Sequence, residues 1–234
     1  MAGRWDTVTV DGGSMRCYVS APAGDGPFPA VVVAQHAGGV DEFIQTMTDR
    51  LADAGYVGIA PELYHREDPN SSDNAIVMMT RLRDPNIVQD MNAAVAHLKT
   101  LSEADGDRIG VTGFCMGGRV AYLMASHDPE LKAAVVFYAG NTMKPWGEGP
   151  TPFDRTDQIG CPVMGLFGEE DASPNPDEVA KLDAELSRLD KAHEFHSYAG
   201  AGHGFMGEGS PSYHREAAED AWPKCVGWFD RYVK

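Results

Sequence analysis

The sequence predicts an α/β fold in which a mostly parallel sheet of about seven or eight strands has helices on both faces. Short apolar runs recur along the 234 residues, and helical patterns lie between most of them. Apolar runs of this length suit strands that are buried on both faces. Strands and helices that alternate along a chain are typical of a parallel sheet with helical connections. A chain of this length commonly forms one core, so residues 1–234 are expected to be a single domain.

Eight segments are expected to be strands. The first two flank the turn sequence "DGG", whose residues tolerate the positive φ of a hairpin, so the sheet should begin with an antiparallel edge. The expected strands cover residues 7–10, 15–20, 30–34, 56–60, 108–113, 133–139, 163–168 and 193–198.

Helical periodicity fills most of the intervals between these strands. The expected helices cover residues 41–55, 86–101, 176–189 and 215–232, and a further helix follows residue 115. Pro223 lacks an N–H, so it should kink the last helix or start it afresh. Two polar segments rich in Pro or Gly, 64–74 and 140–160, each follow a strand. Because loops at the carboxyl ends of parallel strands bind ligands in such sheets, both segments are candidate rims of a site.

Charge and composition exclude several classes of protein. The chain carries 19 basic and 35 acidic residues, a formal charge of −16, so its surface should repel nucleic acid and anionic membranes. The N-terminal residues lack the apolar stretch of a signal peptide, and the longest apolar runs are too short to span a bilayer. We therefore expect a cytoplasmic protein with no nucleic-acid or membrane partner.

One of the four cysteines differs from the rest. Cys17, Cys161 and Cys225 are interpreted as small buried residues, whereas Cys115 lies between glycines in "GFCMGGR". The surrounding sequence predicts a strand, a tight turn and a helix, which is the context of the G-x-S-x-G nucleophile, with cysteine in place of serine. A thiol at a helix N-terminus is favoured as thiolate. The motif alone leaves open that the glycines only pack the helix and that Cys115 is buried.

An acid and a histidine follow later strands, which favours the catalytic interpretation. Asp171 comes after the seventh expected strand, with Glu169 and Glu170 as rival acids. His203 lies in "AGAGHGF" after the eighth. Nucleophile, acid and histidine in this chain order, each following a strand, predict a catalytic triad of Cys115, Asp171 and His203.

Four stretches of the sequence, "AGYVGIAPELYHR", "GVTGFCMGGRVA", "LFGEEDASPNP" and "YAGAGHGF", resemble the dienelactone hydrolase family of the α/β-hydrolase superfamily. The resemblance extends over nearly the whole chain. Cysteine at the nucleophile turn is specific to this family among α/β hydrolases. The resemblance implies an α/β-hydrolase fold and a carboxymethylenebutenolidase-like enzyme that cleaves a carboxylic ester or lactone.

The resemblance also implies roles for the site residues. Cys115 would attack the carbonyl carbon and form a thioester, His203 would transfer protons, and Asp171 would orient His203. The oxyanion would be held by the backbone N–H groups of Met116 and Ala37.

Two departures from the family's dienelactone-cleaving members bear on the substrate. His36 stands where they carry a glutamate against the thiol; it either lowers the thiol pKa or only holds the "HAGG" loop. Gly207 stands where they carry an arginine that binds the substrate carboxylate, and Arg81 or Arg83 matches a second family arginine only loosely. A neutral ester or lactone is therefore the expected substrate.

The sequence does not decide the roles of two aromatic residues or the exact reaction class. Tyr138 and Phe205 are expected near the site, where they either line the substrate pocket or belong to the core. The same triad would also serve an acyl transferase or a thioesterase, and a noncatalytic relative that binds a small molecule is a further possibility. No metal or nucleotide cofactor is expected, because neither ligand spacing nor a P-loop is present. A monomer is expected by family resemblance.

Overall fold

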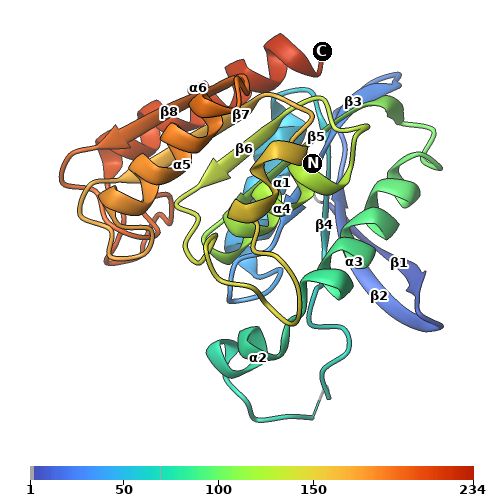
Figure 1. Cartoon of the computed structure of the whole chain (residues 1–234). Helices are drawn as coiled ribbons and strands as arrows, with labels where there is room; N and C mark the ends of the chain where they lie inside the picture. Colours follow the sequence, from blue (N-terminus) through green and yellow to red (C-terminus); the bar gives the residue numbers. More distant parts are fainter. Residues whose placement is uncertain (1–2, 69) are drawn as a thin grey trace.

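The sheet is continuous and has eight strands in the order β1-β2-β4-β3-β5-β6-β7-β8 (Figure 1). The computed structural model describes residues 3–68 and 70–234. The strands are β1 (Arg4–Val10), β2 (Gly13–Ser20), β3 (Phe28–Ala34), β4 (Val57–Pro61), β5 (Ala104–Phe114), β6 (Ala134–Phe137), β7 (Val163–Gly168) and β8 (His193–Tyr198).

The direction of the strands confirms the mostly parallel sheet. β1 pairs with β2 and β2 with β4 in antiparallel register, and every later pairing, from β3–β4 to β7–β8, is parallel. β3 and β5 lie side by side near the middle, with Ala34 opposite Gly113. The carboxyl ends of the parallel strands therefore meet along one edge of the sheet, where the chain turns into loops and helices.

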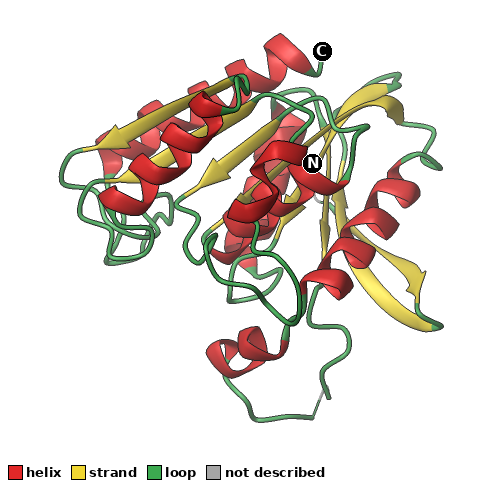
Figure 2. Ribbon diagram, in the orientation of Figure 1, coloured by secondary structure: helices red, strands yellow, loops and turns green. Residues whose placement is uncertain are grey.

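Helices cover both faces of the sheet (Figure 2). α1 and α6 pack on one face, and α3, α4 and α5 pack on the other. α2 has no buried residue and projects from the body of the molecule (Figure 1). The helices are α1 (Glu42–Asp53), α2 (Ala75–Arg81), α3 (Asp84–Leu98), α4 (Met116–His127), α5 (Pro176–Arg188), α6 (Arg215–Tyr232) and the 3-10 helix η1 (Phe153–Gln158).

Two details differ from the sequence-based expectations. α6 runs through Pro223 without starting afresh. Its apolar face, which includes Ala221, Cys225 and Phe229, is buried against the sheet, and this packing outweighs the local cost of proline. The segment 140–160 was expected to be irregular, yet it contains η1; α2 begins directly after the segment 64–74.

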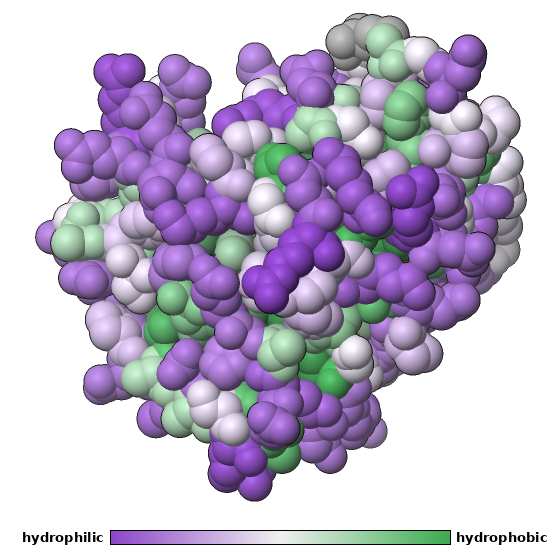
Figure 3. Space-filling model, turned by 90° about the horizontal axis from the view of Figure 1, so that it is seen from above, coloured by the Kyte–Doolittle hydropathy of each residue, from purple (hydrophilic) through white to green (hydrophobic). Residues whose placement is uncertain are grey.

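The surface of the protein is largely hydrophilic on the face shown in Figure 3, where apolar side chains occur as small scattered groups. Over residues 3–68 and 70–234, no helix combines the length and apolarity that crossing a membrane requires.

Candidate active site

Cys115 lies at the turn between β5 and α4, at the edge of the sheet where the parallel strands end. Its backbone has φ 58° and ψ −119°, an uncommon conformation for a residue with a Cβ. The Cys115 N–H donates to the carbonyl oxygen of Phe137 on β6 (3.1 Å), and its own carbonyl accepts from the N–H of Gly118 (3.0 Å). Neighbouring backbone thus holds the strained turn and places the thiol at the N-terminus of α4.

Glycines permit the close approach of chains at this turn. A Cβ on Gly113 would lie 2.0 Å from the carbonyl oxygen of Gly117, and one on Gly117 would lie 2.1 Å from the carbonyl oxygen of Ala34. A Cβ on Gly118 would lie 2.4 Å from the carbonyl oxygen of Phe137. These are backbone atoms that cannot rotate away, so the three positions require glycine.

The structure brings together the three residues of the predicted triad. His203 Nδ1–H donates to Asp171 Oδ2 at 2.8 Å, and His203 lies near enough to Cys115 to lower the pKa of its thiol. Asp171 is buried, and its second oxygen accepts from the N–H of Ser173 at 2.8 Å. The rival acids, Glu169 and Glu170, are both exposed. Of the three carboxylates, Asp171 is therefore the one that contacts His203.

Contacts around Cys115 favour a thiolate paired with a protonated imidazole. Burial of Cys115 disfavours the thiolate, but the hydrogen bond and charge of His203, together with two backbone N–H groups, outweigh burial and lower the pKa of the thiol. Burial of His203 likewise favours its neutral form, but Asp171 and Cys115 outweigh it and raise the pKa of the imidazole. The opposite directions of these two shifts are those of an ion pair.

Two backbone N–H groups favour the thiolate form of Cys115. They belong to Met116 and Ala37, the positions predicted for the oxyanion hole, and both lower the pKa of the thiol. Tyr64, which follows β4, fixes the Ala37 loop because its hydroxyl donates to the Ala37 carbonyl oxygen at 2.9 Å. Tyr64 was not singled out from the sequence, although it lies within the motif "PELYHR". Donors held in this way can stabilise negative charge on an oxygen bound at the same place.

Cys115 and His203 lie between two cavities. The first, which we call the His36 cavity, has a volume of about 270 Å³ and is lined by His36, Phe43, Phe114, Cys115, Tyr138, His203, Gly204, Gly207, Glu208 and Ser210. The second, the Trp146 cavity, has a volume of about 330 Å³ and is lined by Ala37, Ile76, Met79, Cys115, Met116, Gly140, Asn141, Trp146, Asp171, Ala172, Ser173 and His203. Among these lining residues, all of them described by the structure, there is no lysine or arginine.

His36 lines the first cavity, but its polar contact is with its own loop. Its Nε2 lies 2.8 Å from Asp41 Oδ2, and its ring packs on Phe43 with 5.5 Å between ring centroids. The groups that lower the pKa of Cys115 are His203 and two backbone N–H groups. Of the two roles left open for His36, these contacts favour holding the "HAGG" loop over activating the thiol.

The remaining predicted substrate-binding residues divide between cavity and core. Tyr138 lines the His36 cavity, and its ring packs edge-on against His203 at 5.2 Å between centroids. Phe205 is fully buried behind Tyr138, at 5.1 Å between centroids, so it belongs to the core rather than to a cavity wall. Arg81 lies outside both cavity linings, because its guanidinium pairs with Glu67 and Asp73 on the surface. Of the two roles left open for Phe205 the structure shows the core, and the expectation that Arg81 binds the substrate is corrected.

The fold and this arrangement of side chains are those of an α/β hydrolase. Residues 15–233 match the model of the "Dienelactone hydrolase family", and the chain belongs to that family. A protein of Escherichia coli K12 named "Putative carboxymethylenebutenolidase" is 36% identical over 233 residues, which cover 97% of this chain and 86% of that one. A "Probable 2-oxo-3-(5-oxofuran-2-ylidene)propanoate lactonase" of Bradyrhizobium is 27% identical over 223 residues, 93% of this chain and 90% of the relative.

A solved structure is similar over the same length. The "Putative Dienelactone Hydrolase" from Klebsiella pneumoniae superposes with a TM-score of 0.90 at 34% identity, covering 98% of each chain. Family membership identifies the protein as a hydrolase of the dienelactone hydrolase type.

The contacts of the thiol predict how its reactivity depends on pH. Replacing His203 with glutamine should shift the midpoint of iodoacetamide alkylation of Cys115 to higher pH, because burial then dominates the thiol pKa. His36→Gln should leave the midpoint unchanged, because His36 pairs with Asp41. Peptide mass spectrometry after timed alkylation measures both. An unchanged midpoint in the His203 variant, or an upward shift in the His36 variant, would contradict this account.

Proposed function

We propose that the protein hydrolyses a neutral carboxylic ester or lactone through a thioester on Cys115. The observation that carries the proposal is that His203 binds Asp171, with 2.8 Å between Nδ1 and Oδ2, and lowers the pKa of the Cys115 thiol together with the backbone N–H groups of Ala37 and Met116. Nucleophile, base, orienting acid and oxyanion donors are the parts that acyl transfer to water needs.

The first half of the reaction acylates the thiol. The Cys115 thiolate attacks the carbonyl carbon, and the N–H groups of Ala37 and Met116 stabilise the oxyanion. Collapse of this intermediate breaks the bond to the leaving oxygen, which takes a proton from the His203 imidazolium. The lowered pKa of the thiol and the raised pKa of the imidazole both favour this starting state, in which the nucleophile is ionised and the acid is protonated.

The second half releases the acid. Neutral His203 takes a proton from water, the hydroxide attacks the thioester carbon, and the carbon–sulfur bond breaks. Cys115 leaves as thiolate, and His203 keeps the proton, so the resting ion pair is restored. Asp171 is buried and hydrogen-bonded to Nδ1, so it holds the imidazole in the orientation that presents Nε2 to the thiol and the substrate.

The charges around the site favour an uncharged substrate. Neither cavity is lined by a described lysine or arginine, whereas Glu208 lines the His36 cavity beside Gly207. A carboxylate on the substrate would meet this negative group without a cationic partner, and such like-charge contacts oppose binding. The ion pair between Cys115 and His203 carries no net charge and does not offset that repulsion.

A matched pair of chromogenic esters tests the proposal. p-Nitrophenyl butanoate and mono-p-nitrophenyl succinate have acyl groups of similar length, but only the second carries a carboxylate. We expect kcat/KM to be at least about tenfold higher for the butanoate. Turnover of neither ester would indicate a noncatalytic binding protein, and preference for the succinate would refute the neutral substrate. Ester exchange that exceeds hydrolysis in dilute alcohol would indicate an acyl transferase instead.

A further inference from the structure

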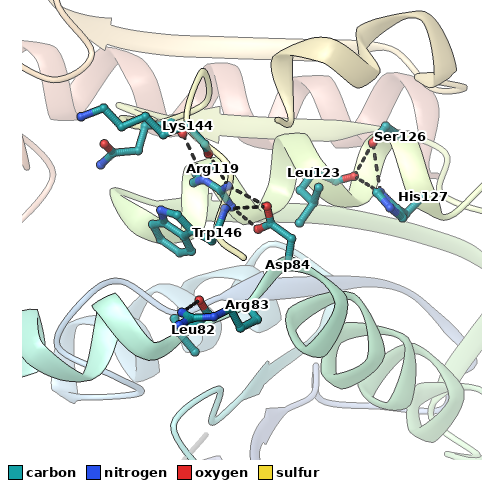
Figure 4. Close-up of polar contacts among 10 residues, drawn as sticks. Leu82, Arg83, Asp84, Arg119, Leu123, Ser126, His127, Lys144 and Trp146 are labelled. Carbon is teal, nitrogen blue, oxygen red and sulfur yellow. Dashed lines mark hydrogen bonds and ion pairs between the residues drawn. The ribbon is translucent and has the colours of Figure 1, made fainter. Parts of the chain in front are cut away.

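Arg119, the last residue of "GFCMGGR", forms the centre of a cluster next to the candidate active site. Its side chain has no exposed surface. The guanidinium makes two hydrogen bonds with the Asp84 carboxylate, at 2.6 and 2.9 Å, and donates to the carbonyl oxygens of Asn141 at 3.1 Å and Lys144 at 2.8 Å (Figure 4). A buried guanidinium is tolerated only when its charge and N–H groups are paired, and here α3 and the loop after β6 supply the partners of Arg119, which lies on α4.

Trp146 is fixed by the same cluster. Its ring packs on the Arg119 guanidinium, with 4.0 Å from the guanidinium carbon to the ring centroid (Figure 4). The backbone N–H of Trp146 donates to Asp84 Oδ2 at 3.1 Å, and the backbone carbonyl oxygen of Trp146 accepts from the backbone N–H of Asp84 at 2.7 Å. Backbone and ring of Trp146 are therefore both held, within a loop that is otherwise rich in glycine, proline and polar residues.

The held tryptophan is part of the wall of the Trp146 cavity, which also contains Cys115 and His203. α2 contributes Ile76 and Met79 to the same wall. Ile76 is 59% exposed, which leaves most of a large apolar side chain in water at the rim of the cavity. Exposed apolar surface that adjoins a reactive thiol can gain free energy when a substrate covers it.

We propose that the Trp146 cavity is a subsite for an apolar alkyl or aryl group of the substrate, with Trp146 as its fixed wall and Ile76 and Met79 as its rim. This inference rests on the proposed ester hydrolysis and names the part of the substrate that the site selects. Arg119 is a positioning residue: it touches Trp146 rather than the substrate, because its N–H groups are engaged by Asp84 and backbone carbonyls.

Selectivity for chain length follows from burial of the apolar group. Each methylene that moves from water into an apolar site favours binding by about fourfold. p-Nitrophenyl hexanoate has four more methylenes than the acetate, so we expect its kcat/KM to be at least about tenfold higher. Hexyl acetate and ethyl acetate differ instead in the length of the alcohol half of the ester. If the ratio of kcat/KM for long and short esters is larger for the acyl pair, the acyl half occupies the subsite; if it is larger for the alcohol pair, the alcohol half does.

Variants of the wall test the subsite, with the ratio of kcat/KM for long and short esters as the readout. Trp146→Ala should lower the ratio by about tenfold and Ile76→Ala by about threefold. Arg119→Lys should lower it as well, because an ammonium group cannot replace the planar fork that holds Asp84 and Trp146. A general loss of structure lowers both rates together and does not change the ratio.

Two matched controls should keep the wild-type ratio. Trp5 on β1 also packs under an arginine, Arg16, at 4.0 Å, but lies outside both cavity linings. Val77 is 37% exposed on the same helix as Ile76 but does not line the Trp146 cavity. Trp5→Ala and Val77→Ala therefore truncate a tryptophan and a β-branched side chain, as the two wall variants do, at positions outside the Trp146 cavity.

The outcomes separate this inference from the proposed function. A ratio that falls in the Trp146 and Ile76 variants and persists in both controls supports the subsite. Turnover of the acetates and hexanoate without a preference for chain length, or with a preference that Ile76→Ala does not reduce, overturns the subsite while the hydrolase remains. Because most of Ile76 is exposed, that variant should fold even if Trp146→Ala or Arg119→Lys does not. Failure to turn over any of these esters overturns the proposed function itself.

Discussion

Replacing Cys115 with alanine is expected to lower kcat/KM for p-nitrophenyl butanoate by at least about 10⁴-fold. The change removes the thiol whose pKa is lowered by His203 and by the N–H groups of Ala37 and Met116. What remains is a site that still binds and polarises the ester but has no group to form the thioester. Steady-state release of p-nitrophenol, corrected for the rate in buffer, measures the effect.

Cys161→Ala is the matched control for this experiment. Cys161 is also a free cysteine, but it is buried away from both cavities, and burial raises the pKa of its thiol to about 12. The Cys161→Ala protein should therefore hydrolyse p-nitrophenyl butanoate at the wild-type rate. Activity of Cys115→Ala within tenfold of the wild type would show that the nucleophile is another group or a water molecule.

The second large effect is on stability. Gly117→Ala is expected to destabilise the fold by more than about 3 kcal/mol, or to prevent folding, because its Cβ would lie 2.1 Å from the carbonyl oxygen of Ala34. Relief of this contact would require α4 to move away from β3, and Cys115 would move with the helix. Denaturation by urea, followed by circular dichroism, measures the free energy of unfolding.

Gly227→Ala provides the comparison within a helix. Gly227 lies in α6, and beyond its chain neighbours and the backbone of its own helix a Cβ there would meet no atom within 4 Å. Alanine has the higher helix propensity, so this variant should be as stable as the wild type or up to about 1 kcal/mol more stable. Equal stabilities of the Gly117 and Gly227 variants would contradict the tight packing of the nucleophile turn.

The fold could be predicted from the sequence because its signals are local. Buried parallel strands are continuous apolar runs, and β7 has the predicted bounds of residues 163–168. α2 gave a weaker signal, because its seven residues are too few to show an apolar periodicity. The continuity of α6 through Pro223 depends on packing against the sheet, which is a tertiary effect.

Some features of the candidate site could likewise be predicted from the sequence, and others could not. Cys115, Asp171 and His203 could be singled out because each follows a strand, and parallel strands bring their carboxyl ends to one edge. Contacts between segments that are distant in the sequence could not be predicted in this way. The packing of Trp146 on Arg119 and the pairing of Arg119 with Asp84 join residues whose side chains carry no sequence signal for one another. Likewise, only the structure shows that His36 pairs with Asp41 and that Phe205 lies behind Tyr138.

Identification of the acylated residue tests the central claim most directly. p-Nitrophenyl trimethylacetate has a hindered acyl group that slows deacylation, so the acyl-enzyme should accumulate and survive an acid quench. Peptide mapping by mass spectrometry should then find one trimethylacetyl group on Cys115, released by hydroxylamine and absent from the Cys115→Ala protein. An acyl group on any other residue that forms and decays at the rate of turnover would contradict the thioester mechanism.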